Sequence, residues 1–546
     1  MTTDLSQLFS DYSEVYTRGE YLTFPNKIIA IQFRGKFYRF EQANQVIEKE
    51  SPSFIKWVTG EESQPADIVF SHEFDRNLKP DGFSLEVTDK AITVKTKNMR
   101  GFRYAKEAFF KLWQVSETGI NCPLISIYHT PSFQLRGVIE GFYGIPWTHE
   151  DRLDCLHFLG EHRLNTYMYA PKDDEYQRKL WRKPYPEQEL DKFKELLVVA
   201  EEEQVDFWYM ISPGNDIAYT QPEEMKVLTD KLDQLINLGI RHFGLLLDDI
   251  DYILKGEAKK RFSSSASAHA FIISQVDQYL SQVLHDYQLV ACPTEYDNSH
   301  DSLYLEQLNE ELPSHIPLFW TGPSTLASHI RTKDIELMAS IYQRPMIIWD
   351  NVPVNDYQKD YELLFMSPYE NRSPYLNQAS FNVQGIVSNP MAQWEISKLT
   401  VDNMSRYLWD TQAYKVVHAW QETLEHYTGS TELAEALKIF AWHNQNKYTQ
   451  EPIPFDIKEG IRLKDTEKLT AYLEQLLKAS RQLKEIDQPA FQEKIAPWLA
   501  RCEKDWQFWQ TILTEDCQKI AKEKEQLLTY PHRIGTNIPM NYLEKH

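Results

Sequence analysis

The sequence predicts an α/β protein: a (β/α)8 TIM barrel, preceded by a small α+β domain and followed by a helical bundle. Three observations predict this fold class. Between Leu135 and about Pro390, eight short apolar runs start roughly 30 to 45 residues apart. Amphipathic segments of helical period separate these runs, and the strand pattern fades beyond about residue 425. Eight strands alternating with helices favour a closed barrel over the rival fold, a doubly wound open sheet, which usually has fewer strands.

The chain has 546 residues, which is too long for one hydrophobic core. We expect domain boundaries that give an N-terminal α+β domain at 1–130, the barrel at 131–425 and a C-terminal helical domain at 426–546. In the first segment, residues 83–87 and 92–94 alternate apolar and polar side chains around a turn at Asp89-Lys90, which predicts two half-buried strands. Residues 105–113 predict a helix with one apolar face. Nothing in this segment indicates catalysis.

The eight apolar runs predict the barrel strands in order. They are LRGVIE, NTYMYAP, VDFWYMISP, HFGLLLDD, LVACPTEY, PLFWTGP, MIIWDN and GIVSNP. The segment before the fourth run illustrates the intervening helices. Pro222 suits a first helical position, apolar residues recur at three- and four-residue spacing from Met225 to Leu235, and Gly239 supplies a stop.

The C-terminal segment has helical rather than strand periodicity. Two sets of apolar residues each fall near one helical face: Leu469, Leu473, Leu476 and Leu483, and then Trp498, Cys502, Trp509 and Leu513. A helical bundle is therefore expected, with its tryptophans more readily explained as core than as a carbohydrate platform.

Composition limits the partners and the compartment. A formal net charge of −22 repels phosphate backbones, so nucleic acid is an unfavourable partner. No segment has the roughly 20 apolar residues of a membrane helix, and the first thirty residues lack the pattern of a signal peptide. We expect a cytoplasmic protein unless a leader was removed. The five widely spaced cysteines predict neither zinc nor a disulfide framework and are interpreted as mostly buried hydrophobes. The oligomeric state stays open.

The polar residues lie where the strands end, which is the side that carries the active site of a TIM barrel. Seven of the eight predicted strands end in polar residues: Glu140, Lys172, Asp248 and Asp249, Glu295 and Tyr296, Thr321, Asp350 and Asn351, and Asn389. The central feature is the pair Asp248 and Asp249 after three leucines, because burying two carboxylates there is costly unless they have a use. The alternative is a helix-capping aspartate beside a solvated one. Asp251 is expected to cap the next helix.

Several motifs, in order, resemble glycoside hydrolase family 84, the O-GlcNAcase-like β-N-acetylglucosaminidases. They are RGVIEGFYGIPW (136–147), YAPKDD (169–174), LDDID (247–251), PTEY (293–296), WTGP (320–323), WDNVPVND (349–356) and SNPM (388–391). Val352 departs from the pattern, which has an aromatic residue there, so the wall is expected to be less bulky at that point.

The resemblance implies hydrolysis with retention of configuration, in which the sugar's own acetamido oxygen attacks the anomeric carbon and forms an oxazoline. It implies that Asp248 polarises the acetamido N–H and that Asp249 protonates the leaving oxygen and later deprotonates water. A neighbouring anion is expected to help keep Asp249 protonated. It also implies that the Tyr296 hydroxyl places the acetamido oxygen for attack.

The same resemblance implies the substrate-binding residues. Asn351 lies beside the acetamido group, and Asp356 binds the sugar's O4 and O6. Asn389, Lys172 and the backbone of Gly141 approach O3 and O4. The acetamido pocket is lined by Tyr143, Thr321 and Trp349, although packing alone would also explain the last two.

The implied partner is a GlcNAc-bearing glycoside or glycoprotein, with no cofactor and no metal. The alternatives are an enzyme acting on free or cell-wall glycans and a barrel that binds glycans without cleaving them. A metal-dependent hydrolase is disfavoured, because His149, His157 and His162 fall on the first connecting helix, away from the strand ends.

Overall fold

The computed structural model describes residues 8–25, 28–35, 51–58, 66–116, 119–213, 216–357 and 362–546. The chain divides into two compact units. One comprises residues 1–134 with 406–414, and the other comprises 135–405 with 415–546.

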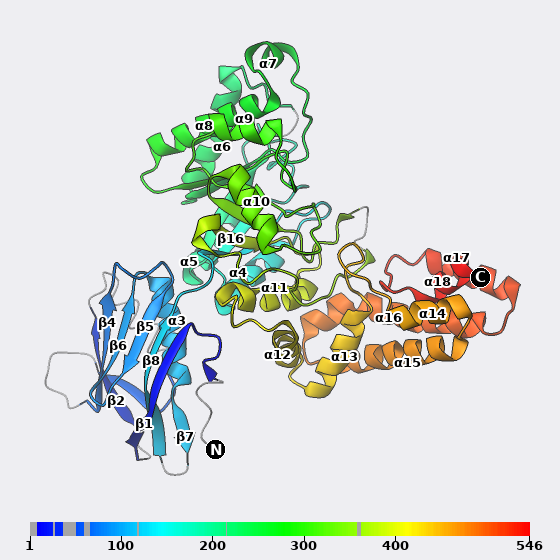
Figure 1. Cartoon of the computed structure of the whole chain (residues 1–546), viewed down its shortest axis with the longest axis horizontal. Helices are drawn as coiled ribbons and strands as arrows, with labels where there is room; N and C mark the ends of the chain where they lie inside the picture. The colour runs from blue at the N-terminus through cyan, green and yellow to red at the C-terminus, as the bar shows by residue number, and fades with distance from the viewer. Residues whose placement is uncertain are drawn as a thin grey trace. The chain divides into compact units, whose positions relative to one another are not determined.

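In the part of the first unit that the structure describes, a mixed sheet packs with helix α3 (Met99–Lys111) in an α+β domain (Figure 1). The strand order is β1 (Glu14–Phe24), β8 (Gly119–His129), β5 (Phe83–Val87), β6 (Ala91–Thr96), β4 (Ile68–Phe74), β2 (Ile29–Gly35) and β3 (Ile55–Val58), with β7 (Gln114–Ser116) paired to β8. The predicted strands are confirmed as β5 and β6, which pair antiparallel. Helix α3 (Met99–Lys111) starts before residue 105, because the Asn98 side chain caps it by accepting from the Gly101 amide at 2.8 Å.

The predicted barrel is confirmed: eight strands close in the order β10-β11-β12-β13-β14-β15-β16-β9, and every neighbouring pair is parallel. They are β9 (Leu135–Glu140), β10 (Thr166–Tyr169), β11 (Asp206–Ile211), β12 (His242–Leu246), β13 (Gln288–Cys292), β14 (Leu318–Trp320), β15 (Met346–Asp350) and β16 (Val383–Ser388). Apolar side chains such as Met168, Trp208, Phe319 and Ile347 form its interior cluster.

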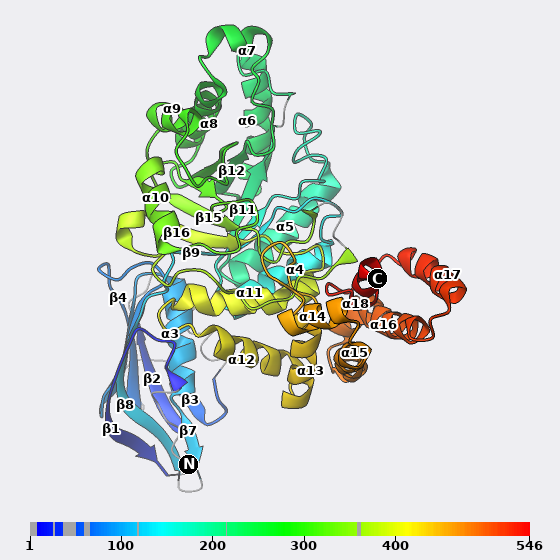
Figure 2. The same cartoon turned by 45° about the vertical axis from the view of Figure 1, so that its right-hand side comes forward.

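Helices alternate with these strands (Figure 2). They are α4 (His149–Glu161), α5 (Glu187–Glu202), α6 (Pro222–Ile236), α7 (Gly256–Arg261), α8 (Ser265–Val283), α9 (Leu303–Glu311), α10 (Thr332–Tyr342), the 3-10 turn η3 (Ala379–Phe381) and α11 (Trp394–Trp409). Helix α6 starts at Pro222 as predicted and buries Leu228, Leu232 and Leu235. Gly239 follows it with a φ of +107°, a left-handed conformation that favours glycine.

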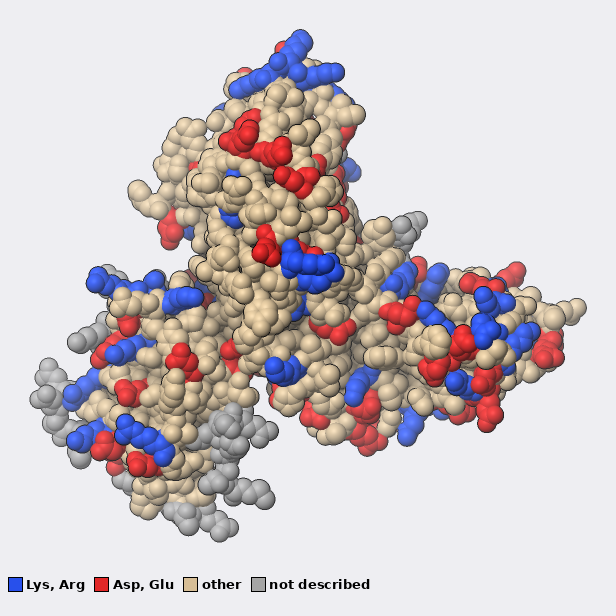
Figure 3. All heavy atoms as spheres, in the orientation of Figure 1, with Lys and Arg blue, Asp and Glu red and all other residues tan. Residues whose placement is uncertain are grey.

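The C-terminal part of the second unit is helical, as predicted. It contains α12 (Val416–Thr428), α13 (Thr431–Trp442), α14 (Phe455–Leu463), α15 (Thr466–Gln482), the 3-10 turn η4 (Leu483–Glu485), α16 (Pro489–Ile512), α17 (Cys517–Leu528) and α18 (Ile538–Lys545). Trp498 and Trp509 are buried in its cores, so the core interpretation of these tryptophans is confirmed, whereas Leu513 is exposed. Acidic and basic side chains are interspersed over these helices (Figure 3).

All five cysteines are free, and all but Cys517 are buried, in agreement with their interpretation as mostly buried hydrophobes. Within the described ranges, no helix combines the length and apolar character that crossing a membrane requires.

Candidate active site

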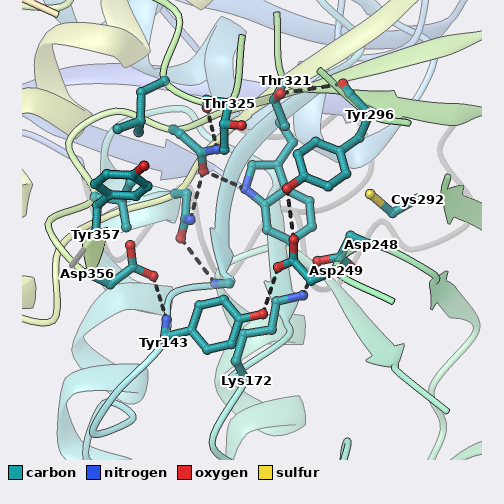
Figure 4. Close-up of a pocket in the computed structure, with 16 residues that line it drawn as sticks. Tyr143, Lys172, Asp248, Asp249, Cys292, Tyr296, Thr321, Thr325, Asp356 and Tyr357 are labelled. Atoms are coloured by element: carbon teal, nitrogen blue, oxygen red, sulfur yellow. Dashed lines mark hydrogen bonds and ion pairs between the residues drawn. The ribbon is translucent and has the colours of Figure 1, made fainter. Parts of the chain in front are cut away.

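One pocket of about 350 Å³ lies at the carboxyl ends of the barrel strands (Figure 4). All eleven residues predicted to act in catalysis or substrate binding line it: Gly141, Tyr143, Lys172, Asp248, Asp249, Tyr296, Thr321, Trp349, Asn351, Asp356 and Asn389. They come from seven different strands or the loops that follow them. The volume suits a small ligand such as one sugar ring.

The backbone after β12 brings the two aspartates to the same pocket. Successive side chains of a strand point to opposite faces, but the chain turns at Asp248 and Asp249. Asp249 has a φ of +52°, in the left-handed region that aspartate tolerates better than most residues. Asp248 is buried with 5% of its surface exposed, whereas Asp249 is exposed.

The two oxygens of Asp248 have different surroundings. Oδ2 accepts a short hydrogen bond from the Lys172 ammonium, which is also buried. Oδ1 is buried and has no hydrogen-bond partner among the residues that the structure describes. A buried acceptor without a donor typically costs about 1–3 kcal/mol. Asp248 therefore presents an acceptor that a ligand N–H or O–H can satisfy.

Both oxygens of Asp249 accept tyrosine hydroxyls. Tyr143 donates to Oδ2 at 2.7 Å, and Tyr296 donates to Oδ1 at 2.9 Å. Partial burial raises the pKa of Asp249, but these two hydroxyls and the charges of Lys172 and Arg178 outweigh it and leave the pKa below its ordinary value. The expectation that a neighbouring anion keeps Asp249 protonated is wrong for this conformation, since Lys172 pairs with Asp248 and the tyrosines favour the carboxylate.

The pKa values of the two tyrosine hydroxyls and of Asp356 are raised, in contrast to that of Asp249. Burial and the Asp249 charge raise the pKa values of Tyr143 and Tyr296 well above their ordinary range, so both remain hydroxyl donors. Asp356 accepts the Tyr143 backbone N–H at 2.6 Å. Its pKa is raised because burial outweighs that hydrogen bond. The pocket thus holds carboxylates whose pKa values are shifted in opposite directions.

A hydrogen-bonded amide cluster fixes another wall of the pocket. The Asn351 Oδ1 accepts from Trp349 Nε1 at 3.1 Å and from Asn389 Nδ2 at 2.9 Å. The Asn351 amide in turn donates to the Thr325 carbonyl at 2.7 Å, and Asn389 Oδ1 accepts from the Gly141 N–H at 3.2 Å. These bonds hold the Trp349 indole in a fixed position in the pocket wall.

Thr321 is held in place by its backbone, whose N–H donates to the Tyr296 carbonyl at 2.9 Å. Its hydroxyl lies 3.4 Å from the same carbonyl oxygen. The threonine is 3% exposed, so it contributes a small buried surface beside the Tyr296 ring.

Other strand-end acids are structural. Glu140 is fully buried, and its two oxygens accept from the Arg152 guanidinium at 2.8 Å each. Asp350 is equally buried and accepts from Arg372 at 2.6 and 2.8 Å. Neither lines the pocket. Position at a strand end therefore predicted the location of the pocket but not which acids face it.

One smaller expectation is wrong. Asp251 accepts from the Ile253 amide at 2.9 Å and so closes a local turn, whereas helix α7 begins later, at Gly256. Val352 is buried but does not line the pocket; Val354, two residues further, does. The less bulky wall expected at Val352 stays a prediction.

Sequence reasoning missed five lining residues: Cys292, Thr325, Leu326, Val354 and Tyr357. Cys292 ends an apolar run, where periodicity gives no sign that its side chain faces a pocket. Sequence reasoning also missed Arg178, which donates to the Tyr143 hydroxyl at 2.9 Å from a loop without periodicity.

The three histidines lie away from the strand ends, as predicted. His149 and His157 lie on α4 and His162 follows it, and each contacts one carboxylate: Glu195, Glu203 and Asp402 respectively. Among the described residues, no group of three or more His, Cys, Asp or Glu side chains is arranged to hold a metal ion.

Comparison with known proteins gives a consistent set of relatives. A sequence model of the β-N-acetylglucosaminidase family matches residues 136–442, more than half of the chain. Protein O-GlcNAcase of Mus musculus is 38% identical over 279 residues, which cover 50% of this chain and 30% of that protein. The Rattus norvegicus protein is 37% identical over the same length. The chain thus spans about a third of the length of these curated relatives.

Solved structures extend the likeness beyond the matched segment. A mutant of the Thermobaculum terrenum O-GlcNAc hydrolase is 29% identical with a TM-score of 0.67, covering 76% of this chain and 94% of that chain. The structure of CpGH84B has a TM-score of 0.78 and covers 98% of this chain and 99% of its own, but at 24% identity it supports the fold alone. On the family match, and in agreement with the barrel and its pocket, the chain belongs to the β-N-acetylglucosaminidase family of O-GlcNAcase-like glycoside hydrolases.

Proposed function

We propose that this protein is a retaining exo-β-N-acetylglucosaminidase that uses the acetamido oxygen of its substrate as the nucleophile. The observation that carries the proposal is the buried Oδ1 of Asp248, which has no hydrogen-bond partner among the described residues and lies next to Asp249 in a pocket of about 350 Å³. An acetamido N–H would satisfy that oxygen. A hydrogen bond from the N–H to a carboxylate makes the amide oxygen more nucleophilic, which this reaction needs.

The first step forms a bond between the acetamido oxygen and the anomeric carbon and breaks the bond to the leaving oxygen. Asp249 donates its proton to that oxygen, and Asp248 takes on hydrogen-bonded charge from the amide nitrogen. In the second step water attacks the anomeric carbon of the oxazoline, Asp249 takes the water's proton, and the acetamido group is restored. Two inversions at one carbon give net retention.

The protonation state of Asp249 sets a condition on this mechanism. In the free protein two tyrosine hydroxyls favour its carboxylate, so the acid form has to be reached as substrate binds. We propose that the sugar does this by engaging the Tyr296 hydroxyl with its acetamido oxygen, which removes one of the two donors from Asp249. The substrate would thereby help to prepare its own general acid.

The remaining lining residues supply recognition in this proposal. Asp356 binds O4 and O6, while Asn389, Lys172 and the Gly141 backbone approach O3 and O4. Tyr143, Thr321 and Trp349 enclose the acetamido group beside Asn351. We further propose that the substrates include O-GlcNAc on serine and threonine of proteins, because the mammalian relatives carry that name.

The test uses the purified chain with aryl β-glycosides. We expect cleavage of the β-GlcNAc glycoside, essentially none of the β-glucoside, and tight competitive inhibition by a thiazoline mimic of the oxazoline, as intermediate analogues show. A covalent sugar trapped on an aspartate or glutamate would contradict the acetamido nucleophile. Absence of turnover with retained thiazoline binding would support the non-catalytic barrel instead.

The substrate class needs a second comparison, between O-GlcNAc glycopeptides and short β-linked GlcNAc oligosaccharides. A higher kcat/KM on glycopeptides supports action on proteins. A higher value on the oligosaccharides would support the alternative of a glycan-degrading enzyme.

A further inference from the structure

Arg178 lies outside the residues assigned above, yet it contacts the site through Tyr143. It stands on the segment between β10 and α5. Its Nη1 donates to the Tyr143 hydroxyl oxygen at 2.9 Å, and its guanidinium carbon lies 5.3 Å from the Tyr143 ring centroid. The Tyr143 hydroxyl donates to Asp249 Oδ2 at 2.7 Å. The three side chains therefore form one hydrogen-bonded chain from a cation to a carboxylate.

The direction of this chain follows from the chemistry of its members. A guanidinium only donates, so the Tyr143 oxygen has to accept from it. The hydroxyl proton is then directed to another acceptor, and Asp249 Oδ2 lies within hydrogen-bond distance for it. Each bond polarises the next, so the positive charge of Arg178 strengthens the donation from Tyr143 to Asp249. Arginine keeps its charge at any pH the enzyme encounters.

We propose that Arg178 is a positioning residue that fixes the Tyr143 hydroxyl as a donor to Asp249 and so sets how readily Asp249 releases and regains its proton. The inference rests on the proposed function of Asp249 as acid and base. Its consequence is asymmetric. A stronger hydrogen bond to the carboxylate makes Asp249 a better proton donor toward the leaving oxygen and a weaker base toward water.

Other groups also face Asp249 and must be separated from Arg178. They are Tyr296, Lys172, Asp248, Asp356 and Cys292. Tyr296 donates to the other carboxylate oxygen, and Lys172 pairs directly with Asp248. Arg178 differs from these because it acts on Asp249 through an intervening hydroxyl. Arg178 also lowers the pKa of Asp249 by its charge through space, so the test has to distinguish the two routes.

The principal variant is Arg178→Gln, which removes the charge, with Arg178→Lys retaining it. Arg182→Gln is the matched control, because Arg182 lies on the same segment and pairs with Asp216 and Glu224 instead. The measurement is kcat/KM against pH on a β-GlcNAc glycoside whose leaving group is a weak acid. For Arg178→Gln we expect the alkaline limb to move to higher pH by about half a unit or more. Arg178→Lys should shift it less, and Arg182→Gln should not shift it.

The same substitution in a Tyr143→Phe variant separates the effect through the Tyr143 hydroxyl from the direct effect of the Arg178 charge. In Tyr143→Phe the hydroxyl is absent, so Arg178→Gln should add little further shift. If Arg178→Gln shifted the pH profile equally in the wild type and in Tyr143→Phe, the role of the Tyr143 hydroxyl would be rejected. Arg178 would then act on Asp249 only by its charge through space. Reduced activity with an unchanged pH profile would also overturn it, because a merely structural residue would give that result.

One readout does not depend on turnover. A ¹³C NMR titration of aspartate-labelled protein, with the Asp249 signal assigned by Asp249→Asn, reports the proton affinity of Asp249 directly. It should rise in Arg178→Gln even if the chain cleaves no GlcNAc glycoside, in which case the proposed function alone has failed. An unchanged titration in an active enzyme rejects the role of Arg178 alone.

Discussion

Gly141 and Trp349 approach so closely that a Cβ on Gly141 would lie 2.3 Å from the Trp349 Cζ2 atom. The Trp349 ring cannot easily retreat, because its Nε1 donates to Asn351 and the amide cluster holds Asn351 in turn. The glycine therefore allows the indole to line the pocket in close contact with the chain that follows strand β9.

Gly141→Ala tests this relationship. Overpacking of this kind typically costs about 1–3 kcal/mol, and relief here requires movement of the indole. We expect a lower melting temperature and a fall in kcat/KM of at least about a hundredfold, since small displacements in an active site cost that much. Differential scanning calorimetry and initial rates measure both. Gly137→Ala is unsuitable as a control, because a Cβ on Gly137 would clash with the Thr166 backbone. Unaltered activity of Gly141→Ala would show that the Trp349 ring is free to move.

Arg152→Met tests whether Glu140 is structural. Glu140 is fully buried and accepts from Arg152, from the Tyr167 hydroxyl at 2.5 Å and from the Trp147 amide at 3.1 Å. Removing the cation leaves a buried charge uncompensated, for which we expect a loss of about 3–5 kcal/mol in the free energy of unfolding. Urea denaturation of the single variant and of Arg152→Met/Glu140→Gln measures it. The double variant should recover part of the loss, and strictly additive losses would contradict the pairing.

The barrel could be predicted because its strands are buried on both faces and so appear as continuous apolar runs. Its pocket could be located because polar residues such as Asp248, Tyr296 and Asn389 follow those runs directly. The direction of the pKa shift of Asp249 could not be predicted, because it depends on where the Tyr143 and Tyr296 hydroxyls lie in space. Arg178 could not be predicted either, because it lies in a loop without periodicity and its partner Tyr143 is 35 positions away in the chain.

Asp356→Asn should stabilise the fold while lowering the activity of the protein. The pKa of Asp356 is raised in the folded state, chiefly by burial. A raised folded pKa contributes stability that is present at low pH and lost as pH rises through that pKa, so the charged form is the destabilising one. The melting temperature of Asp356→Asn minus that of the wild type should therefore grow from about pH 3 to pH 7, reaching roughly 2 °C. Thermal scans at constant ionic strength measure it, and a difference that shrinks with rising pH would reverse the assignment.

Sugar choice provides a separate test of Asp356. In the proposed function its carboxylate accepts from an equatorial O4, which β-GlcNAc has and β-GalNAc lacks. Asp356 is half-buried, and leaving its sugar-facing oxygen without a donor costs a few kcal/mol, so we expect kcat/KM to favour the GlcNAc glycoside by roughly a hundredfold or more. The comparison uses two aryl glycosides with the same leaving group. Comparable kcat/KM values would remove Asp356 from O4 recognition.

The two aspartates of the pair should be separable by leaving group. Asp249 is proposed to protonate the departing oxygen, and that help matters little when the leaving group is already a weak base. Asp249→Ala should therefore fail on alkyl or seryl glycosides and keep appreciable cleavage of aryl glycosides with acidic phenols. Asp248 is proposed to act on the acetamido group, which every substrate needs, so Asp248→Ala should lose activity on all of them.

General acid catalysis typically contributes about 10² to 10⁴ in rate, so the contrast between the two variants is large enough to measure. The measurement is log kcat/KM against leaving-group pKa for the wild type and both variants, and only Asp249→Ala should give a steeper slope. The structure adds a reason to expect this division: Asp248 is buried against Lys172, whereas Asp249 is exposed and so can reach a leaving group that departs into solvent. A steep slope for Asp248→Ala instead would reverse the two roles, and full activity of both variants would place the catalytic groups elsewhere.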